Sequence, residues 1–275
     1  MSRKDWTNEK LFTRLLNNKS DKTYWQNIGE LRSRPNSEVF ATSIKLTKSN
    51  KFNERIIGID ILAQLGISPR PFYKKTIKCF FSLLKNESNE KVLSSLLFAI
   101  GHNNENLNKS QVGLISSYKN HINVGVRQGL VFAIGGVSNP LAVRTLIFLS
   151  DDKFSSIRNW ATFGIGSLTE ENSEVLRDAL WERVKDAHQE TKLEAILGLA
   201  KRKDSRVKEI IKKEIINGEF GIVLLEAIDE FKDKQFLPLL KQNLLIAKNN
   251  KNINPEWLKE FEAFIKKYKL IKNIR

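Results

Sequence analysis

The chain has 275 residues, of which 41% are apolar, and it carries a formal charge of +15 at pH 7. The apolar fraction predicts a folded chain with a core. The nearly apolar runs, such as residues 129–137, fall short of the roughly 18 residues that cross a bilayer, so we expect no membrane span. Asp5 and Glu9 interrupt the place where an export signal needs apolar residues, so we expect a cytoplasmic location.

The first expected element is helical and lies within residues 1–35. Its apolar residues follow a helical spacing at Trp6, Leu11, Leu15, Leu16, Trp25 and Ile28. We interpret this stretch as an amphipathic N-terminal cap, because the end unit of a repeat array would otherwise expose an apolar face.

A short apolar pattern then recurs through residues 36–235. Its copies are 57–66 (IGIDILAQLG), 92–101 (VLSSLLFAIG), 126–135 (VRQGLVFAIG), 157–166 (IRNWATFGIG), 191–200 (TKLEAILGLA) and, more weakly, 223–232 (VLLEAIDEFK). A further helix is expected before each copy, at 38–47, 71–84, 109–118, 140–149, 174–185 and 206–216. The copies end 31 to 35 residues apart. Such a period predicts about six stacked helical hairpins.

Residues 236–275 close the chain as a predicted C-terminal cap. A proline suited to a first helical turn opens the segment 255–271, whose apolar side chains are spaced by three and four residues. Runs of alternating polar and apolar residues with hairpin turns are not found, so the predicted fold class is all-α.

The copies resemble the HEAT-like repeats named after phycobilisome lyases. The resemblance rests on Val-Arg at 126–127, on helices ending in Ala-Ile-Gly, and on the acidic turn at 151–152; it spans roughly residues 24–233. It implies a right-handed α-α superhelix, and similarity to bacterial HEAT-repeat proteins of mostly unassigned function. The family's arginine at the second position is present only as Arg127 and Arg158, with Lys192 in one copy and Gly58, Leu93 and Leu224 in the others.

A binding face is predicted from the helical wheel of the repeated pattern. Positions zero, four, five and eight of each copy cluster toward the core, and positions two, three, six and ten point away toward the expected concave face. Large rings and amides on such a face are typical of interface hot spots. The predicted partner-binding residues are Phe98, Gln128, Phe132, Asn159, Trp160 and Phe163. The alternative is that these rings are core between adjacent helices; exposure of Trp160 would discriminate.

The predicted function is a non-catalytic scaffold that binds a protein or peptide partner. The alternative is nucleic-acid binding through a basic surface. Basic residues are in excess in the N-terminal two thirds, but most of these lysines lie on the first helix of each hairpin, where a charge run is usually a solvated face. Salt dependence of binding would separate the two.

No catalytic residue, metal site, cofactor or small-molecule substrate is predicted. His102, His121 and His188 stand in separate units without neighbouring ligands at metal-binding spacing. A remote alternative is a resemblance to alkylpurine DNA glycosylases, which hold damaged DNA in a basic groove; the aspartate expected close after Trp160 is missing, and Asp60 is the candidate carboxylate. The single cysteine, Cys79, is expected to be a buried apolar side chain.

Overall fold

The computed structural model describes residues 2–218 and 220–270, which form sixteen α-helices and, within those ranges, no β-strand. The chain is therefore an all-α solenoid, as predicted. The helices are α1 (Asn8–Leu16), α2 (Asp21–Arg32), α3 (Ser37–Leu46), α4 (Phe52–Ala63), α5 (Tyr73–Leu84), α6 (Glu90–Gly101), α7 (Lys109–Ser116), α8 (Val124–Ile134), α9 (Pro140–Leu149), α10 (Ser155–Ser167), α11 (Glu174–Arg183), α12 (Gln189–Lys201), α13 (Lys208–Asn217), α14 (Ile222–Phe231), α15 (Leu237–Asn249) and α16 (Pro255–Lys269).

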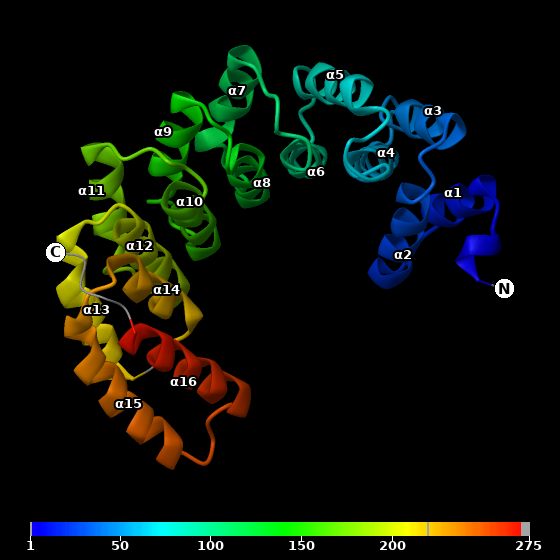
Figure 1. Ribbon diagram of the computed structural model, residues 1–275. Coiled ribbons are helices and arrows are strands. Elements are labelled where there is room, and N and C mark those ends of the chain that lie inside the picture. Colours follow the sequence, from blue (N-terminus) through cyan, green and yellow to red (C-terminus); the bar gives the residue numbers. More distant parts are fainter. Residues whose placement is uncertain (1, 219, 271–275) are drawn as a thin grey trace. The chain divides into compact units, whose positions relative to one another are not determined.

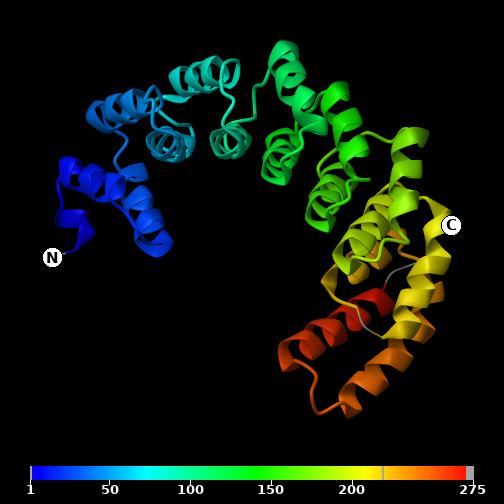
Figure 2. The same ribbon diagram turned by 180° about the vertical axis from the view of Figure 1, so that it is seen from behind.

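Two compact units make up the chain, Met1–Thr145 and Leu146–Arg275. In the first unit, α1, α3, α5 and α7 form one row, which we call the first helices, and α2, α4, α6 and α8 form the other, the second helices (Figure 1). The view from behind shows the same two layers (Figure 2). In the second unit, α10, α12 and α14 are the corresponding second helices, and α11 and α13 are first helices.

Successive second helices pack closely within each unit, whereas neighbouring first helices of the first unit stand farther apart. Glycine makes the close packing possible. A Cβ on Gly129 of α8 would lie 2.9 Å from the Leu97 Cβ of α6, and one on Gly198 of α12 would lie 2.7 Å from the Gly166 Cα of α10. Any larger residue at these positions would push the helices apart.

Asparagine begins many of the helices. The side chains of Asn36, Asn89, Asn108, Asn123 and Asn254 accept hydrogen bonds from the first backbone N–H groups of α3, α6, α7, α8 and α16. Such caps satisfy donors that have no partner inside the helix. Local sequence therefore sets where these helices begin.

Three arginines brace the second helices in the same way. Arg55, Arg127 and Arg158 each donate from Nη1 to the backbone carbonyls five and six residues earlier. Arg158 also pairs with both carboxylate oxygens of Asp186, at 2.7 and 2.8 Å. This partly buried ion pair, made by two hydrogen bonds, holds α10 against the following repeat.

The position of Arg55 corrects the alignment of the first copy. Arg55, not Gly58, is the counterpart of Arg127 and Arg158, so the first copy starts three residues earlier than expected. α4 begins at Phe52 and α6 at Glu90, 38 residues later, which exceeds the predicted period of 31 to 35. The extra residues lie in the loop around the Ser68–Pro69 and Arg70–Pro71 bonds, which cannot continue a helix.

The two ends of the chain are helical. α1 and α2 fill the predicted N-terminal segment, and α16 follows the helix expected over 255–271, although Ile271 lies outside the described residues. α15 was not predicted. Trp257 and Phe261 of α16 pack around Phe220, and the Tyr268 hydroxyl donates to the Asp233 carbonyl at 2.9 Å. The proposed limits of the two caps, 1–35 and 236–275, stay predictions.

None of the described helices has the length and apolar character that a membrane span requires.

Candidate binding surface

The six residues predicted to bind a partner are divided between the two units. Phe98, Gln128 and Phe132 belong to the first unit, and Asn159, Trp160 and Phe163 belong to the second. The six residues stay a prediction as a binding site. Each is described here within its own unit.

In the first unit the rings of Phe98 and Phe132 pack against each other. The ring centroids of Phe98 and Phe132 are 5.5 Å apart, and His102 meets the Phe132 ring edge-on at 5.0 Å. A Cβ on Gly101 would lie 2.3 Å from Phe132 Cδ1, so the ring occupies the space that this glycine leaves open. Both rings and Gln128 are half-buried. Neighbouring side chains therefore cover part of each ring.

Asp60 takes the place of a ring in the preceding repeat. Counted from the first residue of each helix, Phe98, Phe132 and Phe163 are the ninth residues of α6, α8 and α10, and the ninth residue of α4 is Asp60. The sequence alignment hid this equivalence because its first copy was set three residues too late. The same position therefore carries a carboxylate in one repeat and aromatic rings in the next three.

Two hydroxyl groups hold the Asp60 carboxylate. Tyr24 Oη of α2 donates to Oδ2 at 2.6 Å, and Ser95 Oγ of α6 donates to Oδ1 at 2.7 Å. Burial raises the pKa of Asp60, although the two hydrogen bonds and the nearby Arg32 guanidinium oppose the rise. Burial, followed by the Asp60 charge, raises the pKa of Tyr24 as well. Both oxygens of the carboxylate are thus engaged, and the network ties three helices together.

Arg32 extends this network toward the surface. It donates to the backbone oxygen of Asp60 and, from Nη1 at 2.6 Å, to Gln64 Oε1. Gln64 Nε2 lies 3.4 Å from His102 Nδ1, and the pKa of His102 is lowered by burial and by neighbouring arginines. The Arg32 guanidinium also lies 5.8 Å from the ring centre of Trp25, which is 53% exposed. We call Trp25, Arg32, Gln64, His102 and Phe132 the first-unit surface.

The sequence did not predict Tyr24, Trp25, Arg32 or Gln64 as part of this surface. Tyr24, Trp25 and Arg32 come from α2, which was interpreted only as a cap. Aligning the copies on Arg55, Arg127 and Arg158 would have put Gln64 at position ten beside His102. That signal was available in the sequence, whereas the approach of α2 to α4 was not.

The second unit presents an exposed ring. Trp160 of α10 is 46% exposed, and its ring packs edge-on against Phe163 with centroids 5.9 Å apart. Asn159 donates from Nδ2 to Glu190 Oε2 at 3.3 Å, while its Oδ1 is buried and has no hydrogen-bond partner among the described residues. We call Asn159, Trp160, Phe163, Glu190 and Glu194 the second-unit surface.

Acidic side chains border this surface. Burial raises the pKa of Glu194, and the charges of Glu226 and Glu190 add to the rise against the opposing effects of Lys201 and Ser167. An aromatic face beside carboxylates suits cationic or amide-bearing groups of a partner. Across the described ranges, three or more ligating side chains do not come together in a geometry that could hold a metal ion.

The stacked helix pairs, their bracing arginines and their glycine contacts define a HEAT-like repeat protein. No family model matches the sequence. The chain is 28% identical over 232 residues to Protein YibA of Escherichia coli K12, a match that covers 81% of this chain and 80% of YibA, and YibA of strain O157:H7 matches equally.

One solved structure shows the same fold. The X-ray structure of Escherichia coli YibA has a TM-score of 0.72 at 24% identity and covers 96% of this chain and 93% of its own. The complex of CpcE and CpcF of phycocyanin lyase from Nostoc sp. is a more distant neighbour, with a TM-score of 0.48 and 11% identity over 96% of this chain and 95% of that one. The likeness to YibA shows a shared helical-repeat fold.

Proposed function

We propose that this protein is a non-catalytic scaffold that binds a protein or peptide partner through its second helices. The exposure of Trp160 supports this most directly. The Trp160 ring is about half exposed, whereas the other large apolar side chains of α10 are more buried. The ring therefore offers apolar area that a partner can cover at low entropic cost.

The polar groups around Trp160 support the same proposal. Asn159 Oδ1 is buried without a donor, and a buried acceptor without a partner costs about 1–3 kcal/mol. A backbone N–H of a bound peptide would supply that donor once the Asn159 side chain turns to present its oxygen at the surface. Together with Phe163, these groups offer one hydrophobic and one directional contact, as interface hot spots commonly do.

Catalysis has less support. Perturbed pKa values often mark active sites, and those of Asp60 and Tyr24 are perturbed. Yet both carboxylate oxygens of Asp60 already accept hydrogen bonds from protein hydroxyls, so the group is placed to hold helices together. The same engagement weakens the comparison with DNA glycosylases, which rests on a carboxylate available to the substrate.

The test is affinity capture from a lysate of the source cells, with and without nuclease. We expect a protein partner that survives nuclease and is lost with Trp160→Ala. Trp181→Ala, on the first helix α11, is the matched control and should retain the partner. Retention of the partner by Trp160→Ala would reject the proposed surface.

Nucleic-acid binding through the lysines of the first helices is the second candidate. Lys74 and Lys75 on α5 and Lys45 on α3 are exposed, and such a surface attracts phosphate chains. This function predicts that capture is abolished by nuclease and falls steeply with salt, which the scaffold proposal does not.

A further inference from the structure

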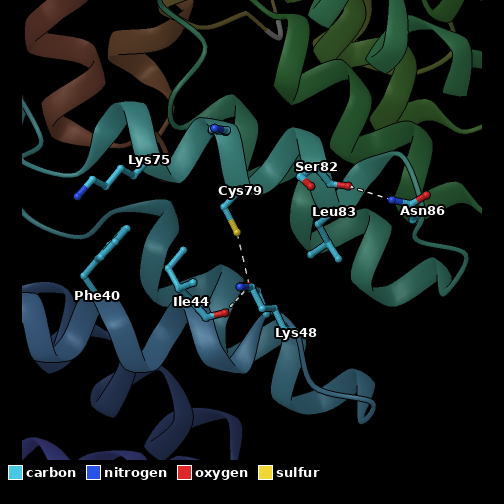
Figure 3. Close-up of a pocket in the computed structure, with 10 residues that line it drawn as sticks. Phe40, Ile44, Lys48, Lys75, Cys79, Ser82, Leu83 and Asn86 are labelled. Atoms are coloured by element: carbon cyan, nitrogen blue, oxygen red, sulfur yellow. Dashed lines mark hydrogen bonds between the residues drawn. The ribbon is translucent and has the colours of Figure 1, made fainter.

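A groove lies between the first helices α3 and α5, on the side of the first unit away from Asp60 and Phe132. It has a volume of about 560 Å³. Phe40 and Ile44 of α3 and Cys79 and Leu83 of α5 line it, and Figure 3 shows the phenyl ring, the isoleucine and the thiol between the two helices. The sequence predicted that Cys79 is a buried apolar side chain, but the residue is half-buried in this wall.

The groove follows from the packing of the repeats. α4 and α6 pack together beneath it, while α3 and α5 stand farther apart above them. The two first helices and their cap residues touch at two places. The rings of Phe40 and Phe72 stack with centroids 4.3 Å apart, and Thr47 Oγ1 lies 3.5 Å from Cys79 Sγ. The same offset of 32 residues at both contacts shows that α3 and α5 run parallel, so the groove extends along them.

The floor of the groove is suited to an apolar chain. Phe40, Ile44 and Leu83 present hydrocarbon there, each only partly buried. The Thr47 hydroxyl, which also lies on the floor, already donates to the Ile44 carbonyl at 2.8 Å. An alkyl chain placed along this floor would cover apolar surface without leaving that hydroxyl unpaired.

The rim is cationic. Lys48, in the turn that follows α3, and Lys75 and Lys78 of α5 are the charged residues among those that line the groove, which include no carboxylate. All three are exposed, and the described part of the chain offers none of them an ion pair. Lys75 and Lys78 lie three residues apart on α5 and so face the same side. An anion at this rim would gain at least two ammonium neighbours.

We propose that the α3–α5 groove binds a monomeric anionic amphiphile of the fatty-acid kind. The alkyl chain lies over Phe40, Ile44 and Leu83, and the carboxylate meets Lys75 and Lys78. The volume falls in the range of about 300–1,000 Å³ that is usual for small-molecule sites. This site is separate from the proposed partner-binding surface, so the two can fail independently.

Cys79 supplies the measurement, because it is the single cysteine of the chain. The rate at which neutral iodoacetamide alkylates Cys79 is measured at increasing dodecanoate concentrations, all below the critical micelle concentration of dodecanoate. At saturation we expect dodecanoate to slow the reaction about fivefold or more by occupying the groove. Dodecyltrimethylammonium, which has the same chain and the opposite charge, should give little protection.

Variants separate the two parts of the site. Ile44→Trp fills the floor and should abolish protection by dodecanoate. Because that variant could disturb folding, Lys75→Gln/Lys78→Gln, which changes only exposed side chains, is measured beside it and should weaken dodecanoate binding about tenfold. Lys109→Gln on α7 is the control and should bind as the unchanged chain does. Circular dichroism verifies the helical content of each.

Several results would overturn the proposal. One is that dodecanoate does not protect Cys79. Another is that the cationic amphiphile protects Cys79 as well as dodecanoate does. A third is that Lys109→Gln loses as much binding as Lys75→Gln/Lys78→Gln. Equal protection by polyglutamate, which has no alkyl chain, would show a surface-charge effect only. Protection by anionic phospholipid vesicles without any by monomeric dodecanoate would make the ligand a membrane surface instead.

Discussion

The second helices of the two units use equivalent positions in different ways. In α4 the ninth residue is Asp60, whose carboxylate accepts two hydrogen bonds within the unit. In α10 the ninth residue is Phe163, and it supports the exposed Trp160. In the first arrangement the polar groups satisfy one another. The second leaves the Trp160 ring half exposed and the buried Asn159 Oδ1 without a hydrogen-bond partner among the described residues.

Under the proposed function, this difference divides stability and recognition between the repeats. Groups that satisfy one another contribute to folding and offer little to a partner. Groups left unsatisfied cost some stability and gain free energy only when a partner covers them. The four predictions below test that division, from the largest expected effect to the smallest.

Asp60→Ala should destabilise the protein by about 2–3 kcal/mol, because the partly buried Tyr24 and Ser95 hydroxyls would lose their acceptor. Urea unfolding followed by circular dichroism measures the change. Asp60→Asn keeps an acceptor oxygen and should lose less than half as much. A stability of Asp60→Ala equal to that of the unchanged chain would mean that the network does not brace these helices.

Trp160→Ala should weaken partner binding by about 2 kcal/mol, roughly thirtyfold, while stability changes by less than about 1 kcal/mol. Titration of the captured partner measures the first and urea unfolding the second. If the variant unfolds and binding by the folded fraction is unchanged, the ring belongs to the core and the contrast with Asp60 disappears.

Gly101→Ala should cost about 1 kcal/mol, because its Cβ would collide with the Phe132 ring 2.3 Å away and force that ring outward. Thermal unfolding measures the loss. Gly113→Ala on α7, where an added Cβ meets nothing within 4 Å, is the control and should be neutral or slightly stabilising. Equal effects at the two glycines would show that Phe132 is not held by this contact.

The smallest expected effect is a dependence of the protein's stability on pH that comes from His102. Its pKa is lowered in the folded protein, so the unfolded chain binds the proton more readily. The stabilising contribution is present above about pH 6.5 and is lost as the pH falls through the folded pKa. In His102→Gln the urea midpoint should depend less on pH between neutral and mildly acidic pH. If the midpoint changes with pH as it does in the unchanged chain, other groups cause that dependence.

Much of the fold could be predicted because its signals are local. Prolines, asparagine caps and helical apolar spacing mark the limits of α3, α5, α9 and α16, which differ from the predicted helices by at most two residues at the described ends. α15 was missed since its apolar residues carry no copy of the repeated pattern. The first repeat was set out of register because terminal glycines were aligned and arginines were not.

The candidate surface was predictable only in part. The ring positions followed from the helical wheel, because one face of each second helix must turn away from the core. Which rings stay exposed depends on neighbouring helices: Phe98 and Phe132 cover each other, while Trp160 extends past Phe163. Trp25 and Arg32 joined the surface through the approach of α2 to α4, which no local pattern encodes.

The sequence by itself determined that this protein is an array of helical hairpins, since periodic apolar residues and helix caps act over a few residues of chain. Only the tertiary structure decided that Asp60 connects three helices, that Trp160 is half exposed, and that α3 and α5 leave a groove between them. Exposure and hydrogen-bond satisfaction are properties of neighbours about 30 residues away along the chain. Packing between repeats sets them.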